Sequence, residues 1–159
     1  MLVRDCAGGL VFKGNKVFIL KNEKGEWVFP KGVKKNGDLL NEVAIKKVKE
    51  ETGISAEIVS TAGSTNYEFF SFTRKRPVCN KITWYAMKCN QDKYKISDEK
   101  FADGGFFDFD EALRMITYSQ DKSLLNLTYE KYKALVWVNQ GRQTVWELAK
   151  KMCLSTRNH

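Results

Sequence analysis

The chain has 159 residues, of which 43% are hydrophobic, so we expect one domain with its own core. Lysine and arginine outnumber aspartate and glutamate by 27 to 19, and the net charge of +8 favours an anionic partner such as a nucleotide, a polyphosphate or a nucleic acid. His159 is the only histidine, which argues against Ser-His, Cys-His and histidine-ligated metal chemistry and leaves carboxylates, lysines and tyrosines for catalysis. The alternative for most of the lysines is a surface that is merely solvated.

The cysteine pattern and the first residues predict a cytoplasmic protein. The four cysteines are scattered without a close pair, which indicates reduced thiols and neither a zinc site nor a disulfide framework. Arg4 and Asp5 precede only a short apolar run, so we expect neither a signal peptide nor a transmembrane helix, and no membrane partner.

Three strands are predicted at the start of the chain. Residues 3–12 form a strand with several small residues, and a turn at Gly14-Asn15 leads to residues 17–20, a continuous apolar run suited to a strand buried on both faces. Residues 27–29 form the third strand, which Pro30 ends.

A helix is predicted from Leu39 to Glu51, because apolar residues recur there at spacings of three and four. Gly37-Asp38 is a plausible start signal, and Gly53 is the residue expected just past the helix end. Near that end Glu50 and Glu51 share a surface patch with Lys47, one turn earlier. Two neighbouring carboxylates beside a glycine loop suit a hard cation such as magnesium, which takes oxygen ligands and often carries substrate phosphates.

Residues 32–54 resemble the Nudix box, whose pattern is G-x5-E-x7-R-E-U-x-E-E-x-G-U with U apolar. The positions that match are the first glycine, an apolar residue, the two adjacent glutamates, the last glycine and the final apolar residue: Gly32, Val48, Glu50, Glu51, Gly53 and Ile54. Three positions differ. Asp38 stands where the family has glutamate, Lys46 where it has arginine, and Lys47 where it has the glutamate of the R-E pair. The last change reverses a charge.

The middle of the chain adds further strands. Residues 56–59, 65–72 and 81–87 are strand-like, and a basic connection lies between the last two. The N-Y-E-F and T-W-Y segments, together with W-x-F-P-K-G ahead of the box, look like the diadenosine tetraphosphate hydrolase branch of the Nudix family.

The last third of the chain is predicted to be a polar loop, a short strand and helices. The loop spans residues 90–102 and contains Asp98 and Glu99, and the strand spans residues 104–109. Asp108 and Glu111 have the spacing of a helix-capping pair. Helices are predicted at residues 122–138 and 144–152.

The Nudix resemblance implies an α+β fold in which a mixed β-sheet is sandwiched between α-helices (α/β/α). We expect a single domain over residues 1–159, with a C-terminal helical extension from about residue 121. The resemblance also implies Mg²⁺, or alternatively Mn²⁺, held by Glu50, Glu51 and the carbonyl of Gly32. Asp38 and Lys46 would form an ion pair that fixes the loop against the helix, more loosely than a glutamate–arginine fork.

The remaining candidate residues follow from the same resemblance. Lys31, Tyr67 and Lys81 are the candidate substrate contacts. Glu50, Glu51 and the late-loop Glu99 are the candidate catalytic residues, with Asp98 as a second candidate for the base.

Three functions remain open. The first is a magnesium-dependent hydrolase that cleaves a pyrophosphate bond in a nucleoside diphosphate derivative such as a dinucleoside polyphosphate. The second is a catalytically weak or inactive nucleotide-binding protein, because Lys47 competes with a cation for the carboxylates. The third, favoured only by charge, is an RNA 5′-end pyrophosphohydrolase. The partner is then a nucleotide or polyphosphate, with RNA less favoured, and the chain acts as a monomer or homodimer.

Overall fold

The computed structural model describes residues 1–139 and Met152. In chain order its elements are β1 (Leu2–Lys13), β2 (Lys16–Asn22), β3 (Trp27–Val28), β4 (Lys31–Val33), α1 (Leu40–Thr52), β5 (Glu57–Ser71), β6 (Arg76–Lys88), β7 (Phe101–Asp108), α2 (Phe109–Met115) and α3 (Ser119–Asn139). The helix predicted at residues 144–152 lies outside the described residues except for Met152.

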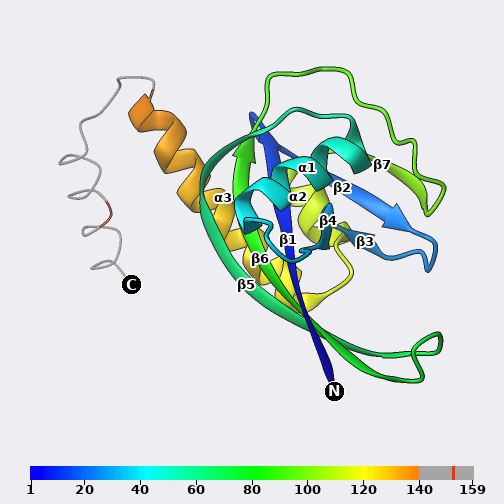
Figure 1. The fold of residues 1–159 in the computed structure, drawn as a ribbon. Coiled ribbons are helices and arrows are strands. Elements are labelled where there is room, and N and C mark those ends of the chain that lie inside the picture. The colour runs from blue at the N-terminus through cyan, green and yellow to red at the C-terminus, as the bar shows by residue number, and fades with distance from the viewer. Residues whose placement is uncertain (140–151, 153–159) are drawn as a thin grey trace.

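The strands form one mixed, curled sheet (Figure 1). Its main path runs β3-β2-β1-β6-β5, with β4 paired to β1 and β7 paired to β2. The central pair, β1 and β6, is parallel from Leu2–Val78 to Phe12–Lys88, and the other pairings are antiparallel. This sheet with three helices is an α+β fold, as the sequence predicted.

Alternating side chains of the central strands supply two cores, one on each face of the sheet. Val17 and Ile19 of β2 belong to one cluster, whereas Phe18 and Leu20 belong to the other, as expected for a strand buried on both sides. The helix α1 covers the second face with residues that include Val48.

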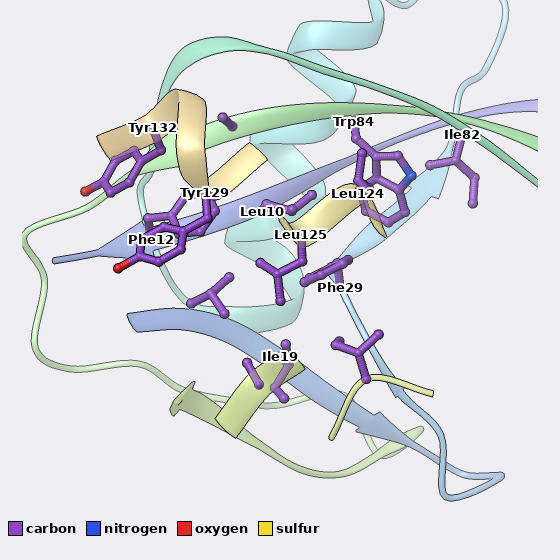
Figure 2. Close-up of a cluster of buried hydrophobic side chains, with 14 of the residues drawn as sticks. Leu10, Phe12, Ile19, Phe29, Ile82, Trp84, Leu124, Leu125, Tyr129 and Tyr132 are labelled. Atoms are coloured by element: carbon purple, nitrogen blue, oxygen red, sulfur yellow. The ribbon is translucent and has the colours of Figure 1, made fainter. Parts of the chain in front are cut away.

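On the first face, α3 packs against the sheet (Figure 2). Figure 2 shows Leu124, Leu125 and Tyr129 of α3 beside residues of β1 and β6. The ring of Phe12 stacks on both Tyr129 and Tyr132, with centroid separations of 5.8 and 4.6 Å. The predicted helix at residues 122–138 therefore belongs to the core of the described fold.

Two local predictions were wrong. We expected residues 56–59 and 65–72 to form separate strands. The structure has one continuous strand, β5, and its pairing with β6 shifts in register between Ile58 and Ser60 and between Thr61 and Gly63. Gly63, with φ of 135°, permits this bulged backbone. Asp108 does stand at the N-cap of α2, but its side chain makes no capping hydrogen bond.

Within the part of the chain that the structure describes, no helix is long and apolar enough to cross a membrane.

Candidate functional site

A cleft of about 570 Å³ contains five of the predicted site residues: Lys31, Gly32, Glu50, Glu51 and Tyr67. They come from three elements. Lys31 and Gly32 lie on β4, the two glutamates lie in the last turn of α1, and Tyr67 lies on β5. Because β4 pairs with β1 and α1 packs on that same strand, the central strand positions both sides of the cleft.

Glu51 is a buried carboxylate of the site, with 6% of its side chain exposed. One carboxylate oxygen accepts a hydrogen bond of 3.0 Å from the backbone N–H of Lys31. The other lies 3.1 Å from the ammonium of Lys100. Burial raises the pKa of Glu51, while Lys100 and the Lys31 amide oppose that rise. The carboxylate thus links α1 to β4 and to the segment before β7.

Glu50 is half-exposed and is paired with lysines of its own helix. Its Oε2 lies 3.1 Å from Nζ of Lys47, and its Oε1 lies 3.9 Å from Nζ of Lys46. The contact between Lys47 and Glu50 is the one expected from their spacing on the helix.

The stem of Lys47 lies directly against Gly32. A Cβ added at Gly32 would come within 2.4–2.6 Å of three carbons of the Lys47 stem. The absence of a side chain at Gly32 therefore lets the Lys47 stem lie close across β4.

The ion pair expected between Asp38 and Lys46 does not form in this structure. The Asp38 carboxylate accepts the backbone N–H of Lys35 at 3.2 Å, and Lys46 faces Glu50. The reason is local. The Asp38 carboxylate is used within its own turn, as is common for aspartate. The N-cap of α1 is the next residue, Leu39, which makes no side-chain capping hydrogen bond.

The late loop contributes Asp98 and Lys100 to the cleft, and not Glu99. Asp98 lies 3.6 Å from Nζ of Lys100 and accepts the Lys100 backbone N–H. Glu99 is exposed and lies outside the cleft lining. This geometry does not support the proposed role of Glu99 and favours Asp98, its neighbour.

Lys81 also lies outside the cleft lining. Its neighbours Asn80 and Ile82 on β6 do line the cleft, and successive side chains of a strand point to opposite faces. Lys81 is exposed and pairs in register with Asn66 of β5. Its predicted contact with substrate is therefore not supported by its position.

A second polar group in the cleft surrounds Tyr67. The Tyr118 hydroxyl donates a hydrogen bond to the carboxylate of Glu26, and the hydroxyl oxygens of Tyr118 and Tyr67 lie 3.2 Å apart. Burial together with the Glu26 and Tyr67 contacts raises the pKa of Tyr118. Burial also disfavours the charge of Glu26, but hydrogen bonds from Tyr118 and Asn22 outweigh it and lower the pKa of Glu26.

Asp121 lines the same cleft from the first turn of α3 and is 8% exposed. Burial raises its pKa to about 6, with Lys31 as the opposing influence. Asp121, Tyr118 and Lys100 were not predicted as site residues. The only sequence signals were the position of Lys100 beside Asp98 and the T-Y-S-Q-D segment at a helix start.

The residues present do not fit a divalent metal ion in the arrangement that the structure shows. The four carboxylate oxygens of Glu50 and Glu51 lie 3.0–3.9 Å from nitrogen atoms of Lys31, Lys46, Lys47 and Lys100. Magnesium requires near-octahedral oxygen ligands at about 2.0–2.1 Å. Among the described residues, no three His, Cys, Asp or Glu side chains form a group that could hold a metal.

Comparisons with known proteins agree with the fold. The model of the NUDIX domain family matches residues 2–127. A mutator MutT protein from Bacillus halodurans is 18% identical, with a TM-score of 0.65, covering 77% of this chain and 80% of that one. A C. elegans Ap4A hydrolase is 19% identical, with a TM-score of 0.61, covering 82% and 98%.

A third solved structure, the E. coli dihydroneopterin triphosphate pyrophosphohydrolase, is 15% identical. Its TM-score is 0.63, and the match covers 79% of this chain and 95% of that one. At these identities the structural matches show the shared fold alone.

Proposed function

The chain belongs to the Nudix family, and we propose that its cleft binds the polyphosphate of a nucleotide. The observation that carries this proposal is that lysine ammoniums and hydrogen-bonding groups line one cleft. The lysines beside the box are Lys31, Lys35, Lys47 and Lys100, and the carboxylates beside them are Glu50, Glu51 and Asp98. The whole lining has five lysines and six carboxylates, because it also includes Lys24, Glu23, Glu26 and Asp121. Lysines outnumber carboxylates only beside the box, and this local excess suits an anionic phosphate chain.

The other part of the cleft suits a nucleoside. Tyr67 is half-buried and offers an aromatic face, on which a base can stack. Glu26 and Asp121 supply carboxylate oxygens, which accept hydrogen bonds from the N–H groups of a base or the hydroxyls of a ribose. Together with the lysines, these groups support a nucleotide over inorganic polyphosphate as the natural ligand.

Hydrolysis of a pyrophosphate bond is the second candidate. It is favoured by the position of Gly32, Glu50 and Glu51 in one cleft and by the family to which the chain belongs. In this reading the enzyme depends on magnesium or manganese, and the Ap4A hydrolase match makes a dinucleoside polyphosphate the first substrate to try. Such activity requires Lys47 and Lys100 to move away from the carboxylates, so we rank it below binding.

We also propose a cytoplasmic location. It is supported by the free, buried cysteines Cys6, Cys79 and Cys89, because reduced thiols persist in reducing compartments.

The test is a nucleotide panel measured in two ways on the same protein. Calorimetry should show binding of nucleoside triphosphates or dinucleoside polyphosphates and much weaker binding of nucleosides. Phosphate detection with magnesium or manganese should show little or no turnover. Lys31→Gln should weaken binding, whereas Lys16→Gln, a change of an exposed lysine outside the cleft lining, should not.

Two results would change this conclusion. Absence of binding to every phosphate compound would reject the proposed function. Turnover in the usual range for enzymes, about 1–1,000 per second, would establish the second candidate in its place.

A further inference from the structure

The two box carboxylates are each paired with a different lysine, and the lysines come from different segments. Lys47 of α1 reaches Glu50, and Lys100, just before β7, reaches Glu51, both at 3.1 Å. Lys46 adds a longer contact of 3.9 Å to Glu50, and Lys100 also lies 3.6 Å from Asp98. The two close ammoniums, those of Lys47 and Lys100, together carry the charge of a divalent cation.

Both ammoniums are held in place by their surroundings. The stem of Lys47 is packed closely against Gly32, where an added Cβ would require the lysine stem to shift. Lys100 lies between Glu51 and Asp98, and its ammonium is also 5.0 Å from the centroid of the Phe101 ring. Since Glu51 is almost fully buried, its charge needs a partner, and Lys100 is the cation that supplies one.

Each ammonium retains donors for a ligand. A lysine has three N–H donors, and both residues line the open cleft. Within the described residues, Lys47 donates to Glu50 alone, and Lys100 lies between Glu51 and Asp98, so each keeps at least one donor for phosphate oxygens. The two lysines can thus connect carboxylates to a phosphate chain, which is the connection that a bridging metal ion makes in other phosphate-binding sites.

From this geometry we propose that Lys47 and Lys100 act as internal counter-ions, so that the cleft binds a nucleotide polyphosphate free of divalent metal. This inference rests on the proposed binding function and adds the ionic form of the ligand. A magnesium ion carried by the polyphosphate would have to displace both ammoniums or separate them from the phosphates. Magnesium should therefore compete with the protein for the ligand.

The test is calorimetric titration of the full chain with ATP and, separately, with inorganic tripolyphosphate, in EDTA and in excess magnesium chloride. We expect binding to be tighter in EDTA than in excess magnesium, because magnesium competes for the polyphosphate. Lys47→Gln should weaken binding in EDTA by about tenfold, the loss expected for one phosphate-binding charge at a part-exposed site. Lys93→Gln, which changes an exposed lysine in the same loop as Lys100, is the matched control and should bind like the wild type.

Lys100→Gln should give the same loss, but it leaves Glu51 buried without its partner and can destabilise the fold. Lys100→Arg is therefore measured beside it, with a thermal melt of each variant. The arginine variant keeps the charge and should retain binding in EDTA.

The outcomes separate the two proposals. Binding that is as tight or tighter with magnesium, or a Lys47→Gln variant that binds as well as the wild type in EDTA, overturns the counter-ion role and leaves nucleotide binding intact. Absence of ATP and tripolyphosphate binding in both conditions overturns this inference, and nucleotide binding itself is rejected only if the dinucleoside polyphosphates of the panel also fail to bind.

Discussion

Lys47 is the cation closest to Glu50. Its ammonium lies 3.1 Å from the Glu50 carboxylate, and its stem crosses Gly32. The i,i+3 pair contributes only about 0.2–0.5 kcal/mol to the helix, so its effect on stability is small. Its effect on a metal is larger, since two unit charges a few ångströms apart interact by about 1 kcal/mol in water and by several at a partly buried site.

Lys47→Glu should therefore have two opposite effects. The metal-free protein should become slightly less stable, by less than about 1 kcal/mol, because three carboxylates then share one helix surface. Magnesium affinity should rise about tenfold or more, because an oxygen ligand is gained and a repelling charge is removed. Magnesium titration by calorimetry, on wild type and variant side by side, measures the change.

The exposed residue Lys16 provides the control, as Lys16→Glu makes the same charge change away from the cleft. Equal or weaker magnesium binding by Lys47→Glu would show that removing Lys47, with Lys100 still paired to Glu51, does not make the box carboxylates a metal site.

At the scale of single residues, the sequence predicted the site residues that belong to one short pattern and missed those that lie outside it. Gly32, Glu50 and Glu51 were predicted because their spacing is characteristic. Lys100 and Asp121 reach the cleft from segments about 50 and 70 residues beyond the box glutamates, and only the three-dimensional fold brings them there. For the same reason, the choice between Asp98 and Glu99 depends on side-chain direction, which the sequence does not specify.

Asp121 should make stability depend on pH. Burial raises its pKa to about 6 from an ordinary value of 3.8, so between these values the folded chain binds more protons than the unfolded chain. The free energy of unfolding therefore falls as pH rises through this window, because the buried carboxyl of Asp121 must ionise. This loss of stability reaches its full size above about pH 6. The two pKa values correspond to a cost of up to about 3 kcal/mol.

Asp121→Asn should remove this cost. The variant should be more stable than wild type at about pH 7.5, and the gain should shrink or vanish at about pH 4. Urea unfolding at both pH values measures it. Asp110→Asn, which changes an exposed aspartate in the first turn of α2, should have little effect at either pH. A gain from Asp121→Asn that is equal at both pH values would contradict the burial argument.

At the scale of elements, the end of α1 positions the two glutamates, and Gly53 forms that end. Gly53 has φ of 73°, in the left-handed region, and its N–H bonds the Lys49 carbonyl at 2.9 Å. The loop before β7 packs against this helix end, and the Lys95 N–H donates a hydrogen bond to the Thr52 carbonyl. A Cβ at Gly53 would lie 3.0 Å from the Lys95 nitrogen.

Gly53→Ala should consequently destabilise the chain by two effects. The left-handed backbone costs about 1 kcal/mol for a residue with a side chain, and the Lys95 backbone must also move. Gly14→Ala is the matched control, because Gly14 has φ of 59° but nothing within 4 Å of an added Cβ. The free energy of unfolding should fall further for Gly53→Ala than for Gly14→Ala, by about 1 kcal/mol or more. Equal losses in the free energy of unfolding would mean that the Lys95 backbone can move away from the added Cβ without destabilising the protein.

The elements themselves were largely predictable because each has a local cause. The apolar spacing in α1 and the continuous apolar run in β2 predicted both elements with nearly the observed bounds. The sequence did not predict that β5 is one strand, because a bulge and a turn use similar residues and Gly63 suits either. Nor did it predict the parallel pairing of β1 with β6, which joins segments about 75 residues apart.

At the scale of the whole molecule, one sheet separates two cores, and we propose that they unfold together as a single domain. Leu20 belongs to the α1-side core and Leu125 to the α3-side core, and both are fully buried. Strands β1 and β2 supply side chains to both cores, so we expect the loss of either core to destabilise the shared sheet.

Leu20→Ala and Leu125→Ala therefore form a matched pair, with the same chemical change on opposite faces of the sheet. Each should cost about 2–5 kcal/mol through lost burial and the cavity left behind. In each variant, far-UV circular dichroism and tryptophan fluorescence should report one coincident urea transition at a lower midpoint. If Leu125→Ala instead separated the two signals, α3 would unfold independently of the sheet. Tyr118 and Asp121, at the start of α3, would then belong to an element that can leave the cleft while the box stays folded.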